Sequence, residues 1–570
     1  MRLSCCVALA RTRGRFGLGP LLSAVLLSGA ACTASTTGVG DDEGEDSTAD
    51  ESADESSSDS GCAVGQVGCM CTEGGGCDPG LECVEGLCES VGGESSSDDE
   101  TDSGSEDGSC SGLGCACDGS PESCDAGLAC VGGMCVSDSC GNGALDANEQ
   151  CDDGDEIIGD GCDPDCTYTE VEELSLGAHH TCALIEGGRL RCWGEGFFGQ
   201  LGYGNMANLG DTETPASVGD LALPLAITDV AAGGYHTCGR FVDESIRCWG
   251  QNFHGQLGYG DTEHRGDDEV LTMLPAVDLG GAGDMLAAGL SHTCVRAGGN
   301  TLRCWGLNTY GQLGISSLDA IGDNELPSAA QYTFLGTEAA ALGLGGFHSC
   351  ATGADNEVRC WGRADRGQSG YGSLTIYGDN EAPADAGPVP AYPEAIPEGV
   401  IINAVALGNE HTCGLFSSGQ VLCWGKNDRG QLGQASTSYG YGYIEGEVPA
   451  NLVPIELGAT ATALAAGGEH TCALLSTGQV RCWGSNFNGQ LGQGNTVDVG
   501  DDEVPAAGTP VELGAPAIMI AAGEAHSCAV TENFEVLCWG ANPDGRLGYG
   551  HTNQIGDDET PASIGPIELL

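Results

Sequence analysis

The sequence predicts an all-β chain in which a β-propeller follows small disulfide-rich modules and acidic linkers. Three observations support this fold class. All seven tryptophans fall in a CWG tripeptide that recurs with the period of a propeller blade. Each CWG lies at a fixed distance from an earlier cysteine. The 97 glycines show no three-residue period, which excludes collagen and favours a turn-rich β chain.

The charge of the chain limits its partners. Asp and Glu number 84 against 18 Lys and Arg, for a formal net charge of −66. Such a charge repels phosphate backbones and anionic lipids, so we expect no nucleic-acid partner and no membrane attachment through basic patches. The basic residues are also unevenly placed, because none lies between Arg15 and Arg189.

The N-terminal segment has the order of a secretory signal. Arginines precede an apolar run from Phe16 to about Leu27, and small residues follow it. The sequence from Gly29 to Cys32 resembles the bacterial lipobox, which implies acylation of Cys32, and Thr33 fits an outer-membrane destination. A plain signal peptide that leaves a secreted chain is the alternative. We therefore expect an exported protein, attached to a bacterial outer membrane or cell surface by its lipid only.

The remaining chain divides by composition. Without Cys5, Cys6 and Cys32, the 33 cysteines leave an even number, which in an exported chain indicates disulfides. The expected segments are a signal peptide (1–31), an acidic disordered tether (32–60), a six-Cys module (61–90), an acidic linker (91–109), a second six-Cys module (110–136), a four-Cys repeat rich in Asp and Gly (137–170) and the propeller (171–570).

The two six-Cys modules share their last cysteine gaps and contain no His, which favours disulfide staples over zinc. The four-Cys segment carries acids between Asp152 and Asp163 that fit either Ca²⁺ ligation or turn formation. We expect no resident cofactor, and Ca²⁺ remains open.

The seven CWG units each contain two cysteines ten positions apart. This spacing predicts a hairpin with a three-residue loop whose last residue is left-handed, as Gly478 would be between Cys472 and Cys482. Opposed cysteines in such a hairpin lie close enough to bond. The predicted disulfides are Cys182–Cys192, Cys238–Cys248, Cys294–Cys304, Cys350–Cys360, Cys413–Cys423, Cys472–Cys482 and Cys528–Cys538.

A His two positions before the first cysteine recurs in every unit, so His and two Cys share a strand face. Three-ligand zinc sites are the alternative to disulfides, but a sevenfold repeat favours a structural role for this His.

The run AAGGEHTCALLSTGQVRCWGSNFNGQLGQG resembles the regulator of chromosome condensation repeat, and similar runs occur seven times from about Val171 to Leu570. The resemblance implies a seven-bladed propeller with four short strands per blade. The first hairpin lacks a preceding segment like ETPASV, and the chain ends with an extra one. We therefore expect the C-terminal segment to complete the first blade.

Four residues between CWG and GQ vary from unit to unit on a constant frame, and the repeat breaks in a Pro-rich insert (385–399) and at SYGYGY. These places predict a docking face, since aromatic and Arg side chains anchor interfaces. Packing of the loops over the blade edge is the alternative. The candidate partner-binding residues are Phe197, Phe198, Phe253, Tyr310, Arg363, Arg366, Lys426, Arg429, Tyr439, Tyr441, Tyr443 and Phe487.

Six units also carry GDxE, such as Gly500 to Glu503, where the acids either cap turns or bind Ca²⁺. No nucleophile-base motif is visible, so we expect no catalytic residue and no enzyme activity. The function predicted is a monomeric, lipid-anchored propeller that binds an extracellular protein or glycan. The alternatives are an extracellular hydrolase or lyase that uses acidic loops, and a passive coat or adhesion protein.

Overall fold

The computed structural model describes residues 81–84, 87–90, 128–131, 134–137, 150–151, 161–162, 166–298, 301–437, 440–444 and 446–570. The predicted signal peptide, the acylation of Cys32, both acidic linkers and Tyr439 lie outside these residues. Contacts divide the chain into two units, residues 1–106 and 107–570.

Each six-Cys module contributes one described hairpin. The strands are β1 (Leu81–Val84), β2 (Leu87–Ser90), β3 (Leu128–Val131) and β4 (Met134–Ser137). Cys83 lies opposite Cys88 in the first hairpin, and Cys130 lies opposite Cys135 in the second. The two hairpins pair their cysteines in the same register, as expected if the two six-Cys modules are copies of one another.

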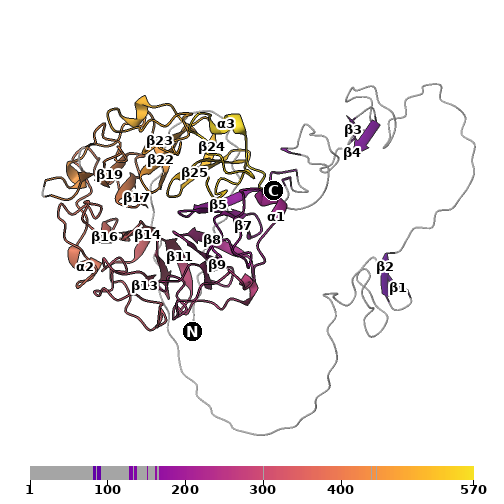
Figure 1. Ribbon diagram of the computed structural model, residues 1–570, viewed down its shortest axis with the longest axis horizontal. Helices are drawn as coiled ribbons and strands as arrows, with labels where there is room; N and C mark the ends of the chain where they lie inside the picture. Colours follow the sequence, from indigo (N-terminus) through magenta and orange to yellow (C-terminus); the bar gives the residue numbers. More distant parts are fainter. Residues whose placement is uncertain are drawn as a thin grey trace, which may run out of the picture. The chain divides into compact units, whose positions relative to one another are not determined.

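The rest of the described chain is all-β and forms seven blades, as predicted. In Figure 1 the sheets lie in a ring, and β5 of the first blade lies beside β24 of the last. The innermost strands are β5 (Val171–Leu176), β8 (Ile227–Ala232), β11 (Gly283–Ala288), β14 (Ala339–Leu344), β17 (Ile402–Leu407), β21 (Ala461–Ala466) and β24 (Ala517–Ala522). The middle strands are β6 (His180–Ile185), β9 (His236–Phe241), β12 (His292–Ala297), β15 (His348–Gly353), β18 (His411–Phe416), β22 (His470–Leu475) and β25 (His526–Thr531).

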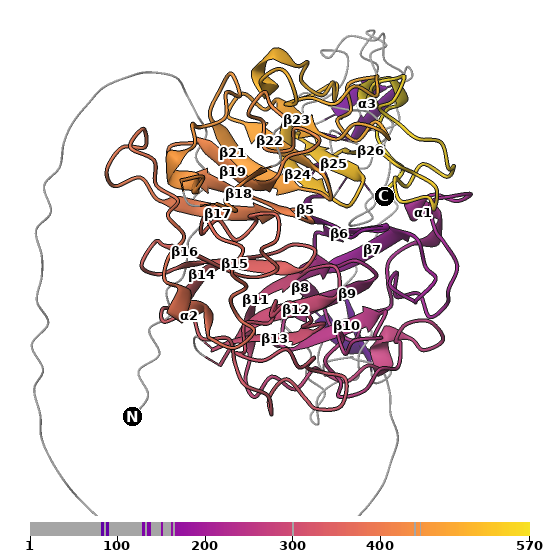
Figure 2. The same ribbon diagram turned by 60° about the vertical axis from the view of Figure 1, so that its left-hand side comes forward.

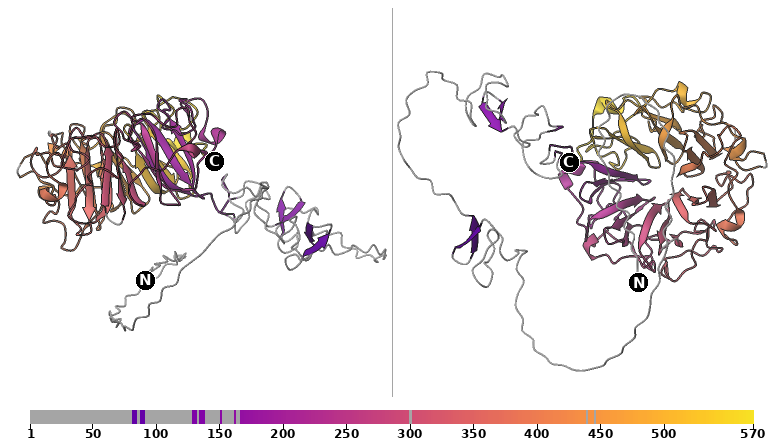
Figure 3. Two further views of the ribbon diagram at one scale, coloured as in Figure 1. Left: turned by 90° about the horizontal axis from the view of Figure 1, so that it is seen from below. Right: turned by 180° about the vertical axis from the view of Figure 1, so that it is seen from behind.

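The outer strands carry the CWG tripeptides. They are β7 (Arg189–Gly194), β10 (Ile246–Gly250), β13 (Thr301–Gly306), β16 (Val358–Gly362), β19 (Val421–Lys426), β23 (Val480–Gly484) and β26 (Val536–Gly540). The resemblance implied four strands in each blade. Within the described residues only the fifth blade has a fourth strand, β20 (Gly440–Tyr441), and in other blades a single bridge such as Gly484–Val499 takes its place. Figures 2 and 3 show neighbouring sheets side by side around the ring.

The hairpin register follows the prediction. Cys472 lies opposite Cys482, and the Leu475 N–H donates to the Gln479 carbonyl at 2.9 Å, which leaves a three-residue loop. The last loop residue is left-handed even where it is not Gly or Asn, with φ of 63° at Glu244 and 59° at Phe534. The hairpin geometry therefore imposes this conformation on residues that disfavour it.

All seven predicted disulfides of the repeats are present, with Cα–Cα distances of 4.0–4.1 Å. A further disulfide joins Cys151 to Cys162 in the four-Cys segment.

The blades adhere through the tryptophans and the GQLG turns. Each Trp is fully buried, and the Trp305 indole Nε1–H donates to the Gln256 carbonyl of the preceding blade at 2.9 Å. Gly258 follows in that turn with φ of 78°, and a Cβ there would lie 2.9 Å from the Trp305 Nε1. The repeated glycine is thus required both by its backbone conformation and by the neighbouring indole.

Return segments connect successive blades. They include short helical turns, five of which begin with a proline, a residue suited to the first helical position. The turns are α1 (Pro215–Val218), η2 (Leu271–Met273), α2 (Pro383–Ala386), η3 (Pro449–Asn451), η4 (Pro505–Ala507) and α3 (Pro561–Ile564).

The prediction that the C-terminal segment completes the first blade is wrong. The Ile567 N–H donates to the Val536 carbonyl of the seventh blade, because each return segment folds back on the hairpin that precedes it. The ring closes instead by contact between whole blades. The Ala216 N–H donates to the Glu568 carbonyl at 3.0 Å, and the Thr181 hydroxyl donates to the Arg546 carbonyl at 2.9 Å.

In the described part of the chain, no helix has the length and apolar character needed to cross a membrane.

Candidate binding face

The variable loops are fixed to the blades by a repeated hydrogen bond. The first loop residue after each CWG donates its N–H to the carbonyl of the residue before the repeated His. The donor and acceptor pairs are Glu195–His179, Gln251–Tyr235, Leu307–Ser291, Arg363–Phe347, Lys426–Glu410, Ser485–Glu469 and Ala541–Ala525. Both members of each pair vary between blades. The variable loop residues therefore lie beside a second set of variable residues, those that precede the repeated His. We call these loops and the residues before each His the variable face.

The repeated histidines join blades instead of binding metal. The His236 Nε2 lies 2.9 Å from the Thr293 hydroxyl of the next blade, and that hydroxyl donates to the Gln256 carbonyl at 3.0 Å. The hydroxyl proton is thereby committed, so the imidazole Nε2–H donates to it. The sulfur atoms of each unit are bonded to one another. The trio of His and two Cys is therefore structural, as the sevenfold repeat indicated.

Burial sets the protonation of these histidines. All seven are 0% exposed, and desolvation lowers the pKa of His236 and His470 to about 4 and that of His180, His292, His348 and His411 to about 3. Burial also lowers the pKa of His526 well below its usual value. The inter-blade network is therefore built on neutral imidazoles.

The predicted aromatic residues of the first two blades come together. Phe198 is half-buried, and its ring centroid lies 4.9 Å from that of Phe197 and 5.7 Å from that of Phe253. It also packs edge-to-face against His264 at 5.2 Å and against Tyr235 at 5.6 Å. Phe197 and Phe253 are 61% and 57% exposed. We call these five residues the aromatic cluster.

A second aromatic group lies on the third and fourth blades. Tyr310 and Phe347 are 5.7 Å apart, and the Arg363 guanidinium lies over both rings, 5.4 and 5.9 Å from their centroids. Phe487, on the sixth blade, is 78% exposed.

The predicted basic loops carry little free positive charge. Arg363 forms ion pairs of 2.7 Å with both Asp365 and Glu410. Lys426 also reaches Glu410 at 3.3 Å, and it reaches Glu469 at 2.5 Å.

The other two predicted cations lie beside these loops. The Arg429 guanidinium lies 3.6 Å from the Asp498 carboxylate. The main-chain N–H of Arg366 donates to the side-chain oxygen of Gln368 at 2.9 Å. Neighbouring carboxylates therefore pair with Arg363, Lys426 and Arg429 of the basic arc that the sequence indicated.

The two predicted breaks of the repeat belong partly to the framework. Tyr441 pairs with Gly425 in the β19–β20 ladder, and the Gly442 carbonyl accepts the Gly372 N–H at 2.9 Å. In the Pro-rich insert Val389 and Ala391 are buried. Tyr443 lies two residues after β20 and makes contacts of its own.

Sequence reasoning missed the residues that precede the repeated His. Tyr235, Phe347, Glu410 and Glu469 complete both aromatic groups and the ion pairs, and none was a candidate. Their signal was available, because this position varies between units while the His after it and the Gly two positions before it stay constant. The same criterion had selected the loops.

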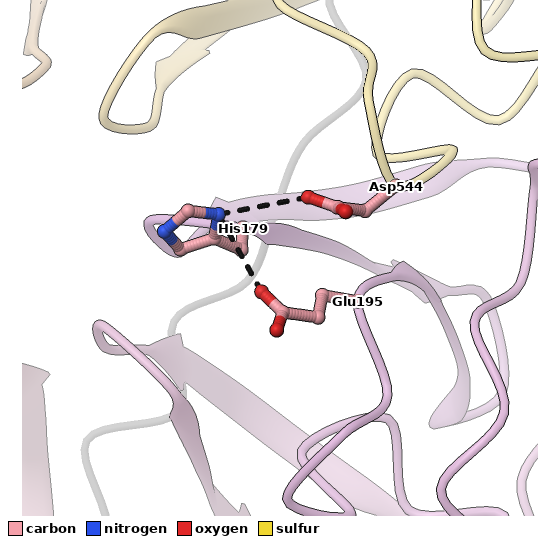
Figure 4. A group of neighbouring side chains, drawn as sticks. All are labelled: His179, Glu195 and Asp544. Atoms are coloured by element: carbon pink, nitrogen blue, oxygen red, sulfur yellow. Dashed lines mark ion pairs between the residues drawn. The ribbon is translucent and has the colours of Figure 1, made fainter.

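A polar cluster occupies the junction of the first and seventh blades. Figure 4 shows the His179 Nδ1 facing Glu195 and Asp544, at 3.5 and 3.7 Å. The Arg546 side chain is 4% exposed, bonds Asp544, and lies 2.8 Å from the same Nδ1. Its donation leaves His179 with the proton on Nε2, facing the Tyr235 hydroxyl at 2.8 Å. A fixed guanidinium against these ligand atoms makes the group an ion-paired cluster and a poor metal site.

The acidic GDxE loops gather carboxylates closely. The three acids of 267–269, of 501–503 and of 557–559 have ligand oxygens within 4.8 Å of one another. Glu269 accepts the Gly266 N–H at 3.0 Å, as expected of a turn cap. Burial and hydrogen bonding from the neighbouring Asp raise the pKa of Glu503 and Glu559 to about 7. Calcium binding at these loops stays a prediction.

The innermost strands line an open axial cavity of about 360 Å³. Its lining is mostly small and apolar, with Glu173 among the exceptions. Glu173 accepts the Val230 N–H at 3.2 Å. Burial and the nearby Asp229 raise the pKa of Glu173 to about 8.

Comparisons with known proteins match this chain over its repeated units. A family model described as the regulator of chromosome condensation (RCC1) repeat matches seven times, at residues 171–200, 227–256, 286–312, 340–368, 402–431, 461–490 and 520–546. A second model of the same description matches residues 187–239, 418–474 and 477–530.

The ultraviolet-B receptor UVR8 of Arabidopsis thaliana is 29% identical over 389 residues, which cover 66% of this chain and 79% of the receptor. The human E3 ubiquitin-protein ligase HERC2 is 26% identical over 69% of this chain, but the match spans only 8% of the ligase.

Two solved structures support the fold. Prp20p of Saccharomyces cerevisiae, which has binding properties to Gsp1p and histones, is 20% identical with a TM-score of 0.50, and the match covers 69% of this chain and 87% of Prp20p. Human WBSCR16 is 21% identical with the same TM-score, and the match covers 65% and 93% of the two chains. On its seven repeats and its blades, the chain belongs to the family of regulator of chromosome condensation repeat propellers.

Proposed function

We propose that this chain is a lipid-anchored cell-surface protein whose propeller presents the variable face to an extracellular protein or glycan, without catalysis of its own. The observation that carries the proposal is the exposure of Phe197, Phe253 and Phe487 on loops whose backbone is fixed by an invariant frame. Large aromatic side chains held at the surface by rigid loops are typical anchors of binding sites, since they bury much area at low entropic cost.

The relatives support a binding role at a coarser level. They include a light receptor, a ligase that carries a similar propeller in a small part of its length, and a yeast propeller that binds other proteins. In this family the fold hosts different partners, so the site must be argued from this chain's own residues.

The cellular location is supported by the cysteines. Seven buried disulfides in one domain persist only where thiols are not kept reduced. The arginines and apolar run before Cys32 supply an export signal, and the Gly29–Cys32 motif supplies the anchor.

Binding is tested by affinity capture with the full chain, followed by mass spectrometry and glycan analysis. The triple variant Phe197→Ala, Phe253→Ala, Phe487→Ala should lose the captured macromolecule. A matched control is Met273→Ala, which removes another exposed apolar side chain, 77% accessible, outside the variable face. Equal capture by the triple variant and the wild type would contradict the proposal.

The anchor is tested separately. Cys32→Ser should move the protein from the membrane fraction to the soluble exported fraction, because a non-acylated chain has no lipid to hold it. Membrane retention of this variant would refute attachment through Cys32.

A further inference from the structure

We propose that the aromatic cluster of the first two blades holds a cationic side chain, an arginine or lysine of a basic polypeptide segment in the partner. The inference rests on the proposed function, because it assumes that the variable face binds a macromolecule. It names the place on that face and the chemistry of the partner.

The chain contains its own precedent for this recognition. On the third and fourth blades, the Arg363 guanidinium lies over the edge-to-face pair of Tyr310 and Phe347. Carboxylates of Asp365 and Glu410 complete the arrangement at 2.7 Å. A cation over aromatic faces with carboxylates beside it is a favourable arrangement for Arg and Lys.

The first two blades repeat the aromatic pair in the equivalent positions. Phe198 corresponds to Tyr310, since the N–H of each donates to the side chain of the following GQ glutamine, at 2.8 and 2.9 Å. Tyr235 corresponds to Phe347, since each carbonyl accepts the N–H of the first loop residue, at 2.8 and 2.9 Å. The pair spacings are 5.6 and 5.7 Å.

The cation is what differs. The residue in the place of Arg363 is Gln251, a neutral side chain whose Oε1 accepts from the Gln256 amide at 3.2 Å. In the described part of the chain, no Arg or Lys lies over Phe197, Phe198, Tyr235 or Phe253. The pair at the first two blades therefore keeps the spacing of the second pair without an internal Arg or Lys. The His179 ring stacks on Tyr235 with centroids 4.7 Å apart, so the guest cation would meet the exposed Phe197 and Phe253 rings beside the pair.

The surrounding charge favours a cation. Burial raises the pKa of the Tyr235 phenol, and the charges of Glu195, Glu524 and Asp544 raise it further. The opposing charge is Arg546, which is buried and bonded to Asp544 and to the Ala178 carbonyl at 3.0 Å. With a net charge of −66 on the chain, a basic segment is attracted and an acidic glycan is repelled.

The rings also offer a prepared surface. Phe197 and Phe253 flank Phe198 and are more than half exposed, while contacts with Phe198 and His264 hold Phe253 in place. A fixed platform loses little entropy on binding.

The test uses the full chain and a synthetic peptide of alternating Gly and Arg, with the citrulline peptide as its neutral isostere. At about 0.15 M salt, where long-range attraction to the acidic segments is screened, the citrulline peptide should bind at least about tenfold more weakly. The variant Gln251→Arg should also bind the Arg peptide about tenfold more weakly, because it supplies an internal guest as Arg363 does.

The matched control is Gln479→Arg, the same change at an exposed position beside a hairpin loop and outside the variable face, which should alter affinity less than about twofold. Phe253→Ala, at an exposed side chain, should weaken binding without affecting folding. Equal binding of the Arg and citrulline peptides, or equal affinity of Gln251→Arg and Gln479→Arg, would overturn the inference.

The macromolecular capture experiment separates this inference from the proposed function. If the wild type captures a partner and Gln251→Arg captures it equally, or if that partner is an acidic glycan, the inference fails and the binding function stands. If the peptides behave as expected but the full chain captures no macromolecule from any extracellular source, the proposed function fails.

Discussion

The seven buried histidines of the repeats predict that the propeller unfolds steeply in mild acid. Each is neutral in the folded state, since burial lowers its pKa to about 3 or 4 where a value is resolved. In the unfolded chain the same side chains titrate near their ordinary pKa of 6.5. As the pH falls below 6.5 the unfolded state binds protons that the folded state excludes, so stability is lost.

The expected loss is large. At pH 5.5 each such histidine favours the unfolded state by about 1.4 kcal/mol relative to high pH, so seven together favour it by about 10 kcal/mol. This sum is comparable with the whole stability of a typical domain, roughly 5–15 kcal/mol. Glu173 acts in the opposite direction, because burial raises its pKa to about 8, but it offsets only about 1.4 kcal/mol per pH unit.

The assay is urea unfolding of the full chain between pH 8 and pH 5, followed by tryptophan fluorescence. Every blade carries one fully buried Trp, so the signal samples the whole ring. If all blades unfold together, the free energy of unfolding should fall by roughly 8 kcal/mol per pH unit near pH 5.5, after allowing for Glu173. If blades unfold singly, the slope should be about one-seventh of this.

The slope therefore counts the blades that unfold as one unit. A free energy of unfolding that stays constant from pH 7 to pH 5 would refute the reasoning, because it would require the histidines to be protonated in the folded ring or solvated in place.

Two further predictions concern single side chains. Glu173→Gln should stabilise the propeller at pH 8 by about 3–5 kcal/mol and be neutral near pH 4.5, because the wild-type contribution is present below the unfolded pKa of 4.5 and is lost as the pH rises through the folded pKa of about 8. The difference between wild-type and variant urea midpoints measures this effect, and parallel pH profiles would contradict it. The double variant Cys472→Ala, Cys482→Ala should lower the free energy of unfolding by roughly 2–3 kcal/mol through the opened hairpin loop. The wild-type protein, in which this disulfide is intact, is the reference. Equal urea midpoints of the wild type and the double variant would contradict the prediction.

Local pairing made much of the fold predictable. A spacing of ten fixes the hairpin register and brings Cys472 opposite Cys482, since residues joined by a tight turn have little freedom to pair otherwise. The period of the tryptophans identified the blades, because each blade repeats the same hairpin along the chain. The exposed aromatics Phe197 and Phe253 also followed from sequence, because variation on a constant frame marks loops at the surface.

Only the tertiary structure decided what happens between blades. Arg363 looked like free positive charge until Glu410 of the next blade was found 2.7 Å away. The repeat pattern placed the C-terminal segment on the first blade, but the Ile567 N–H bonds the Val536 carbonyl of the seventh blade. The pairing of Phe198 with Tyr235 likewise joins residues of different blades. Such contacts depend on the spacing and orientation of packed sheets. The repeat pattern describes each blade separately, so the residue pairs that meet between blades become visible only in the assembled ring.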